Sequence, residues 1–501
     1  MNSRVNEKEA NTLTSVNAPV FTCKDLAPKG NDRESKLCDT IEEAIKRSKL
    51  KNGMTISFHH AFRGGDKVLN KVMRVIAKMG FQDLTIASSS LATVHDELVE
   101  HIKNGVVTQI YTSGLRSKLG EAISHGLMKK PVQIHSHGGR VHLIKSGEIK
   151  IDVAFIGVPS IDKFGNASGS KGRSKCGSLG YAFIDAETAK YVIAISEEMV
   201  TYPNLPSSIS QDQVDAIVLV DEVGDPSKIG EGATRLTTNP KELLIARRTA
   251  NLIEHSGLFN EGFSIQTGTG GAALATTVFL GDKMKEKGIK ADFGLGGITG
   301  TMVYLHEEGL IRKLLDVQSF DSFAAESLDR NPKHIEISAN EYANFSSKGA
   351  AIKQLDVVVL SALEVDVDFN VNVITGSKGL LRGASGGHSD TAAEAKLAII
   401  VCPLTRGRIP TITKRVNTII TPGCTVDAVV TDQGIAVHPR NVELKRKLKK
   451  AGLHLVKIEE LYERAIALCG EPKPIEYLDR SVAVIRYRDG SVIDVVRQLK
   501  K

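Results

Sequence analysis

Short apolar runs alternate with amphipathic stretches along most of the chain, which is the pattern of an α/β protein. Asp356 to Leu360 is a short run of apolar, mostly β-branched residues, as expected of a buried parallel strand, and Leu397 to Leu404 has the same character. Val68 to Met79 instead repeats apolar residues at helical spacing. We therefore predict parallel sheets whose strands are joined by crossover helices.

The pattern occurs twice. Ile151 to Ser168 (IDVAFIGVPSIDKFGNAS) matches Leu355 to Asn372 (LDVVVLSALEVDVDFNVN) in its aspartates and its apolar run. Repeat units of about 200 residues are too long for a solenoid and suit duplicated α/β domains. In this alignment Glu364 falls opposite Ser160, so only the second copy carries a carboxylate at that position.

These patterns predict the order of domains along the chain. A polar N-terminal arm comes first, and Arg488-Asp489-Gly490 is the turn signal of a hairpin at the other end. The predicted segments are an arm (1–34), a first α/β domain (35–225), a helical linker (226–260), a second α/β domain carrying the catalytic glutamate (261–480) and a C-terminal β-hairpin (481–501).

Composition narrows the class of protein. Of the 501 residues 41% are hydrophobic and 25% charged, which is ordinary for a globular protein. A formal net charge of +7 without a block of like charges does not indicate nucleic-acid binding, and small anions or an acidic partner fit better. No apolar run is long enough for a membrane span or a signal peptide, so we expect a cytoplasmic protein without a membrane partner. The six cysteines show no metal-ligand spacing, and no metal site is predicted.

Glu364 is the first candidate for chemistry. It follows a predicted strand, and the carboxyl ends of parallel strands open onto the ligand crevice of α/β proteins. The glycines that follow, above all Gly386 and Gly387, let the backbone approach a ligand and direct N–H groups towards it. A carboxylate beside amide donors suits acyl transfer, with the amides binding an oxyanion. The alternative is a surface acid followed by a flexible loop.

A second glycine turn opens the second half. Gln266 to Ala273 (QTGTGGAA) contains Gly268 and Gly270 between a predicted strand and a predicted helix. The spacing also permits a dinucleotide-binding turn, but no ribose-binding acid follows the next strand. A turn that directs a helix N-terminus towards a carboxylate or phosphate is the simpler interpretation, so Gly268 and Gly270 are predicted to bind an oxyanion. His59 and His60 lack a third metal ligand at suitable spacing and are assigned structural or substrate-lining roles.

The quoted segments resemble a known family. SALEVD (Ser361 to Asp366), RGASGG (Arg382 to Gly387) and TDQGIAV (Thr431 to Val437) are similar to motifs of the CoA-transferase superfamily, especially its 4-hydroxybutyrate and acetyl-CoA transferase branch. From about Leu37 to the C-terminal ribbon the chain resembles the citrate lyase alpha chains most. The resemblance implies two duplicated CoA-transferase-like α/β domains and a citrate:acetyl-acyl-carrier-protein transferase, the subunit that forms citryl thioester for a separate lyase subunit.

The resemblance also implies roles for individual residues. Glu364 sits where the superfamily places its catalytic glutamate, and Gly386 and Gly387 match the loop that approaches the thioester. Many CoA transferases have Glu-x-Gly at this site, whereas Val365 and Asp366 follow here. Citrate lyase alpha chains are usually placed in a class in which citrate attacks the acetyl thioester within a ternary complex. A covalent glutamate intermediate and a ternary-complex route therefore both remain open.

Substrate and partners follow from the same resemblance. A tricarboxylate needs cationic donors, for which Arg382 and Lys378 lead and Arg63 is next. The implied partners are the beta (citryl lyase) and gamma (acyl carrier) subunits, within a complex where this chain forms a homo-oligomer. No intrinsic cofactor is expected, because the thiol belongs to the phosphopantetheine group of the carrier, with acetyl-CoA as a possible substitute. The basic helix Glu443 to Ala451 is a candidate for docking an acidic carrier.

Two other functions stay open at this level. One is a free-standing CoA transferase acting on acetyl-CoA and a small carboxylic acid. The other is a sensor that binds a carboxylate or sugar phosphate on the same scaffold without turnover; the chain shows no DNA-binding helix pair, which counts against a regulator.

Overall fold

The computed structural model describes residues 6–14, 20, 35–230 and 236–500. It divides into two units, Met1–Leu37 and Cys38–Lys501. In the first unit the described part contains helix α1 (Glu7–Thr14). Most of the arm predicted for residues 1–34 lies outside the described residues, and everything below concerns the second unit.

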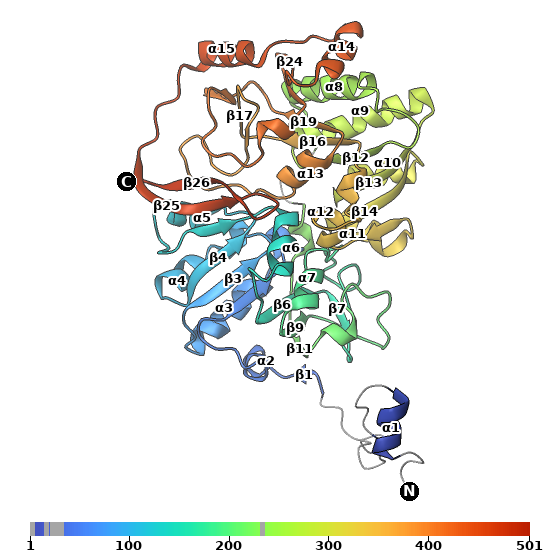
Figure 1. Cartoon of the computed structure of the whole chain (residues 1–501), viewed down its shortest axis with the longest axis vertical. Coiled ribbons are helices and arrows are strands. Elements are labelled where there is room, and N and C mark those ends of the chain that lie inside the picture. The colour runs from blue at the N-terminus through green and yellow to red at the C-terminus, as the bar shows by residue number, and fades with distance from the viewer. Residues whose placement is uncertain (1–5, 15–19, 21–34, 231–235, 501) are drawn as a thin grey trace. The chain divides into compact units, whose positions relative to one another are not determined.

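The first half of this unit is built on a large, mostly parallel sheet (Figure 1). Its strand order is β11-β9-β6-β2-β3-β4-β5-β25-β26, with Cys38 of β1 (Leu37–Cys38) at the β11 edge. The strands are β2 (Thr55–Phe58), β3 (Leu84–Ser88), β4 (Val107–Thr112), β5 (Val132–Ile134), β6 (Val153–Val158), β9 (Tyr191–Ser196) and β11 (Ala216–Leu219). The helices are α2 (Ile41–Arg47), α3 (Val68–Lys78), α4 (Leu98–Lys103), α5 (Ser117–Ser124), α6 (His137–Lys145) and α7 (Phe183–Thr188).

The second half has a sheet of eight strands in the order β15-β14-β13-β12-β16-β19-β23-β24, in which only the β23–β24 pair is antiparallel. The strands are β12 (Ser264–Thr267), β13 (Ala291–Ile298), β14 (Ile311–Ser319), β15 (His334–Glu336), β16 (Val357–Ser361), β19 (Leu397–Val401), β23 (Ala428–Thr431) and β24 (Gly434–Val437). The helices are α8 (Pro240–His255), α9 (Gly271–Lys287), α10 (Gly300–Glu307), α11 (Ser322–Arg330), α12 (Ala339–Ala343), α13 (His388–Glu394), α14 (Val442–Lys450) and α15 (Ile458–Cys469).

The predicted duplication is visible in two small sheets. β7 (Ser160–Asp162) lies between β8 (Ala167–Ser168) and β10 (Met199–Val200), and β17 (Glu364–Asp366) lies between β18 (Val371–Asn372) and β22 (Ile412–Thr413). Ser160 pairs with Ser168 and Glu364 with Asn372, as the alignment requires. The fold class, two related α/β halves, is confirmed.

Two segments pack against parts of the chain that the sequence did not indicate. Helix α8 falls in the predicted linker, yet Ile245, Leu252 and Ile253 are fully buried in the core of the second half. The C-terminal ribbon, β25 (Tyr477–Arg486) and β26 (Val492–Leu499), pairs through β25 with β5 and so extends the sheet of the first half (Figure 1). The chain therefore returns to its first half at its end.

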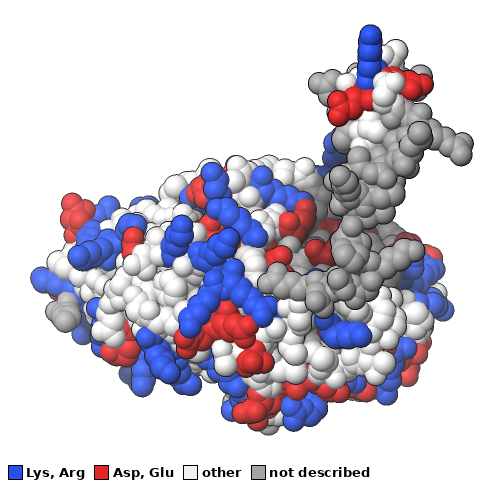
Figure 2. Space-filling model, turned by 90° about the horizontal axis from the view of Figure 1, so that it is seen from below, with Lys and Arg blue, Asp and Glu red and all other residues white. Residues whose placement is uncertain are grey.

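The surface bears charges of both signs. On the face drawn in Figure 2, lysines and arginines are interspersed with aspartates and glutamates. No helix within the described ranges is long and apolar enough to cross a membrane.

Candidate active site at the junction of the two halves

Loops from the carboxyl ends of strands in both sheets meet between the halves. We call this region the junction. His60 follows β2, and its carbonyl accepts a hydrogen bond from Gln318 Nε2 of β14 at 2.7 Å. The amide of His137, which follows β5, donates to the carbonyl of Gly386 at 2.9 Å. The ends of strands from both sheets are thus joined directly, as expected of a site completed by both copies.

The loop after β4 also belongs to the junction. Gly114 forms a bridge with Ala384, and the amide of Leu115 donates to the carbonyl of Gly383 at 3.0 Å. A Cβ on Gly114 would lie 2.3 Å from the Cβ of Ala384, so only glycine allows this approach. The glycine loop of the second half is therefore fixed against Gly114 and Leu115, which immediately precede Arg116.

Arg63 lies in a one-turn 3₁₀ helix (Arg63–Gly65) and has a φ of 51°, which few residues other than glycine adopt. Its guanidinium lies 4.3 Å from the centroid of the Phe320 ring of the second half. Burial, and then the charge of Arg116, lower the pKa of Arg63 to about 10. The predicted substrate-binding residue of the first half is thus present at the junction.

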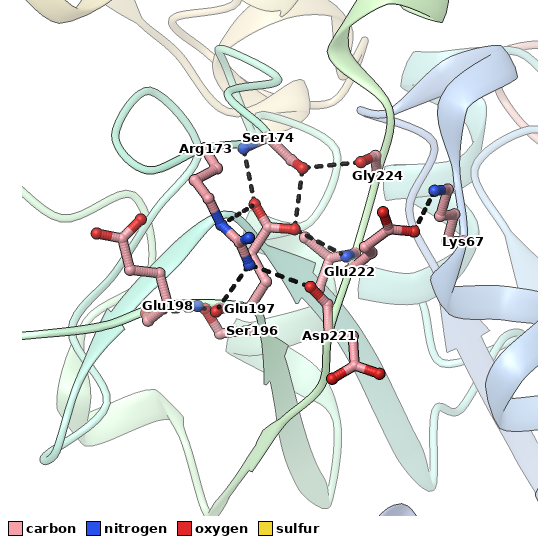
Figure 3. A network of polar contacts seen from close by, with 10 residues as sticks. Lys67, Arg173, Ser174, Ser196, Glu197, Glu198, Asp221, Glu222 and Gly224 are labelled. Carbon is pink, nitrogen blue, oxygen red and sulfur yellow. Dashed lines mark hydrogen bonds and ion pairs between the residues drawn. The ribbon is translucent and has the colours of Figure 1, made fainter.

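A polar network centred on Glu197 (Figure 3) connects to the turn that carries Arg63. The carboxylate of Glu197 accepts hydrogen bonds from the amide of Ser174 at 2.7 Å and that of Val223 at 3.1 Å. The carbonyl of Val223 then accepts from the amide of Lys67 at 3.1 Å, and the amide of Asp225 donates to the carbonyl of Gly65 at 2.9 Å. The network therefore holds the unusual turn at its C-terminal end, through Gly65 and Lys67.

Two histidines form an aromatic stack beside the glycine loop. The His60 ring stacks on those of His137 (centroids 5.4 Å apart) and Tyr181 (4.8 Å). Burial lowers the pKa of His60 well below its usual range and that of His137 to about 3. Both imidazoles are neutral at pH 7, so they add polar atoms to the junction without adding positive charge.

The glycines predicted to bind the thioester or an oxyanion divide into two groups. Gly386, with a φ of 56°, and Gly387 are partly exposed, and a Cβ on Gly387 would lie 2.5 Å from the hydroxyl of Tyr342. Gly268 instead donates its amide to the carbonyl of Val359 at 2.8 Å, so this N–H is used by the sheet and cannot serve an oxyanion. Gly270 has a φ of 118° and precedes α9.

Glu364 does not lie at the junction but in a separate cleft. It lines a cleft of about 740 Å³ with residues such as Lys414, Arg415, Lys473 and Tyr477, none of which belongs to the junction. One carboxylate oxygen accepts from Asn372 Nδ2 (2.8 Å) and the Asn417 amide (3.0 Å), and the other from Asn417 Nδ2 (2.8 Å). Burial raises the pKa of Glu364, and the hydrogen bonds from Asn417 and Asn372 oppose that shift.

The two predicted cations of the second half are exposed. Lys378 and Arg382 lie in the loop between β18 and α13, and the aliphatic part of the Arg382 side chain covers Gly376. In the described part of the chain neither side chain forms a recorded hydrogen bond or ion pair with Glu364 or with a junction residue. Their role in substrate binding stays a prediction.

The catalytic role of Glu364 also stays a prediction, and the geometry favours a structural role. Because Gln would turn one acceptor into a donor facing Asn417 or Asn372, Glu364→Gln should cost about 1–3 kcal/mol of stability. We expect its kcat for citrate transfer to fall by less than about tenfold. Steady-state kinetics with a thermal unfolding curve checks this; a loss of several orders of magnitude in kcat at unchanged stability would restore the catalytic assignment.

Arg116, Tyr181 and Phe320 are junction residues that sequence reasoning missed. A signal was available for Arg116, because it follows the apolar run Val106-Val107 to Tyr111 by only a few residues, as a strand-end loop does. Tyr181 and Phe320 have no comparable signal, since their proximity to His60 and Arg63 depends on tertiary packing.

A family model described as "Citrate lyase, alpha subunit (CitF)" matches residues 34–499. The chain is 66% identical over 475 residues to the citrate lyase alpha chain of Klebsiella pneumoniae, covering 95% of this chain and 94% of that one. It is 67% identical over 493 residues to the alpha chain of Escherichia coli K12, covering 98% and 96%.

A crystal structure assigned to the alpha subunit of citrate lyase from Streptococcus mutans, in complex with citrate, superposes with a TM-score of 0.92 at 53% sequence identity. The match covers 100% of this chain and 99% of that chain.

Proposed function

The chain belongs to the family of citrate lyase alpha subunits, and on that premise we propose that it transfers the acyl-carrier thiol from acetate to citrate. Acetyl-carrier and citrate give citryl-carrier and acetate, the first half of citrate cleavage. The observation that carries this proposal is full-length similarity to alpha chains, together with a junction that combines glycine amides and arginines.

The reaction exchanges acyl groups on one thiol and needs no redox step. A carboxylate oxygen of citrate attacks the acetyl carbonyl, and the carrier thiolate leaves, which produces a mixed anhydride. The thiolate then attacks the citryl carbonyl of the anhydride, and acetate leaves with the electron pair of the broken C–O bond. Each attack places negative charge on a carbonyl oxygen, which fixed donors can stabilise.

The junction contains residues suited to binding the thioester, the attacking carboxylate and the leaving thiolate. The partly exposed backbone at Gly386 and Gly387 lets a thioester approach closely, because no side chain intervenes. Arg63 and Arg116 supply positive charge for a carboxylate nucleophile and a thiolate leaving group. This route passes through a complex of both substrates and requires no attack by Glu364.

The partners are proposed on the same ground. The chain acts in a citrate lyase complex, where we assign it a beta subunit that cleaves citryl thioester and a gamma subunit that carries the phosphopantetheine thiol. We further propose a homo-oligomer within that complex, a cytoplasmic location and acetyl-CoA as a substitute for the acetyl-carrier.

An exchange assay tests the function directly. Purified chain is incubated with acetyl-carrier and labelled citrate, and we expect label to accumulate in citryl-carrier with stoichiometric release of acetate. If label enters only CoA, and carrier is no substrate, the chain is a free-standing CoA transferase. Binding of citrate without any exchange would indicate a sensor.

Helix α14 gives a prediction about carrier docking. Lys445, Lys449 and Lys450 are exposed, whereas Lys447 donates to the carbonyl of Ser256 at 3.1 Å and so joins α14 to the end of α8. Because carrier proteins are typically acidic, Lys449→Glu with Lys450→Glu should lower kcat/KM for acetyl-carrier about tenfold and spare acetyl-CoA.

The matched control reverses Lys129 and Lys130, two adjacent exposed lysines of the first half. Kinetics with both acyl donors separates the possibilities. Equal losses for carrier and CoA, or a loss as large in the Lys129 and Lys130 control, would show that α14 is only a solvated face.

A further inference from the structure

Two arginines of the junction lack an acidic partner. In the described part of the chain, neither Arg63 nor Arg116 forms an ion pair. Arg116 donates one hydrogen bond, from Nη1 to the carbonyl of Leu91 at 3.2 Å, and the recorded contact of the Arg63 guanidinium is with the Phe320 ring at 4.3 Å. Most of their N–H groups therefore remain available to a ligand.

The surroundings make that arrangement unfavourable in the absence of an anion. Arg63 follows β2 and Arg116 follows β4, two strands away in the same sheet, and the Arg116 charge lowers the pKa of Arg63. The carboxylate of Asp321 raises the pKa of Arg63, and its oxygens accept hydrogen bonds from the amides of Gly300 (2.8 Å) and Ala324 (2.9 Å). Because one carboxylate can offset only one of the two positive charges, the pair retains positive charge and N–H donors for an anionic ligand.

Both cations are held in place by the fold. The Glu197 network fixes the Arg63 turn, and the bridge between Gly114 and Ala384 fixes the loop that leads to Arg116. That same bridge brings Arg116 next to the glycine loop that ends at Gly387. A carboxylate bound by Arg116 would therefore lie beside the predicted position of the thioester.

We propose that Arg63 and Arg116 form a clamp that binds two carboxylates of citrate and presents citrate to a thioester at Gly386 and Gly387. The inference rests on the proposed function and names the site where its substrate binds. It replaces Arg382 and Lys378 as the leading citrate ligands and adds Arg116 from the loop after β4. The clamp selects di- and tricarboxylates, because a monocarboxylate such as acetate can satisfy only one of its forks.

Calorimetric titration of the purified full chain with citrate tests the clamp without requiring turnover. Arg63→Ala and Arg116→Ala should each weaken citrate binding at least tenfold, and Arg116→Lys should recover only part of the loss because it restores charge without the planar fork. Tricarballylate, which keeps the three carboxylates, should bind the wild-type chain, and acetate should not compete.

The control is Lys118→Ala, which removes a charge from the exposed residue two positions after Arg116 on α5. It should bind citrate as the wild type does. Circular dichroism establishes that each variant is folded, and Arg116→Lys keeps the test valid if an alanine variant is not. Normal citrate affinity in both Arg63→Ala and Arg116→Lys, or an equal loss in Lys118→Ala, would overturn the clamp.

Kinetics adds an independent readout. In the exchange assay Arg116→Lys should raise the KM for citrate more than it lowers kcat at saturating citrate. If the wild-type chain binds citrate through the clamp but exchanges no label, the proposed function fails while the binding site stands. If the wild-type chain exchanges label and Arg116→Lys keeps the wild-type KM, the clamp fails while the function stands.

Discussion

Replacing Gly386 with valine should lower the kcat for citrate transfer by about 10² or more while the protein stays folded. Gly386 has a φ of 56°, in the left-handed region that a β-branched residue adopts only with strain. A Cβ there would lie 3.7 Å from His137 Nε2, so the first carbon fits, but the branched methyl groups would occupy the space beside the histidine. The backbone would shift, and small displacements of reacting groups carry large rate costs. Single-turnover transfer from acetyl-carrier measures the effect.

Gly452→Val is the matched control for the backbone cost. Gly452 follows α14, has a φ of 74° and has no atom within 4 Å of an added Cβ. It should lose a similar amount of stability and retain its kcat. If Gly386→Val transfers citrate at the wild-type rate, the glycine loop does not form the thioester site.

The largest expected effect on stability is at Arg140. This α6 residue is 2% exposed, and its guanidinium binds Asp185 in a bidentate pair at 2.7 and 3.0 Å while donating to the carbonyl of Ala87 at 2.9 Å. Arg140→Leu would leave the Asp185 carboxylate, 1% exposed, without its counter-charge. Breaking a buried pair from one side costs about 3–5 kcal/mol. Urea unfolding monitored by circular dichroism should show that loss in the free energy of unfolding.

The comparison for this prediction is an exposed pair. Lys103 and Glu100 lie 2.8 Å apart with side chains 53% and 67% exposed, so Glu100→Ala should change the free energy of unfolding by less than about 1 kcal/mol. A similarly small change in Arg140→Leu would mean that Asp185 becomes hydrated or protonated without disturbing α6.

The sequence predicts the repeated α/β scaffold well, and the reason is local. Strands such as Val153–Val158 and Val357–Ser361 are buried on both faces and therefore read as apolar runs, and the aspartates that flank them recur in both copies. The alignment implies that the two copies pair alike, and the structure shows this, with Glu364 opposite Asn372 and Ser160 opposite Ser168. The place of β25 beside β5 could not be expected from the sequence, because nothing local in Tyr477–Arg486 specifies a partner so distant in sequence.

The site was predictable only in part. Glu364 was selected because functional residues often follow the carboxyl end of a parallel strand. In the structure β16 ends at Ser361, and Glu364 begins β17, which belongs to a separate small sheet. The position of Glu364 relative to the main sheet is therefore not the one that the rule assumes. Arg63 was identified by its charge and its glycine neighbours, and the structure places it at the junction. Arg63 and Arg116 follow different strands of the same sheet, β2 and β4, and no spacing along the chain reveals that both belong to the junction.

A crystal structure of this chain with bound citrate tests the central claim most directly. We predict citrate at the junction, with carboxylate oxygens within hydrogen-bonding distance of the guanidinium groups of Arg63 and Arg116 and one carboxylate facing Gly386. Citrate bound instead in the cleft beside Glu364, Lys414 and Arg415, with the junction arginines uncontacted, would contradict the account.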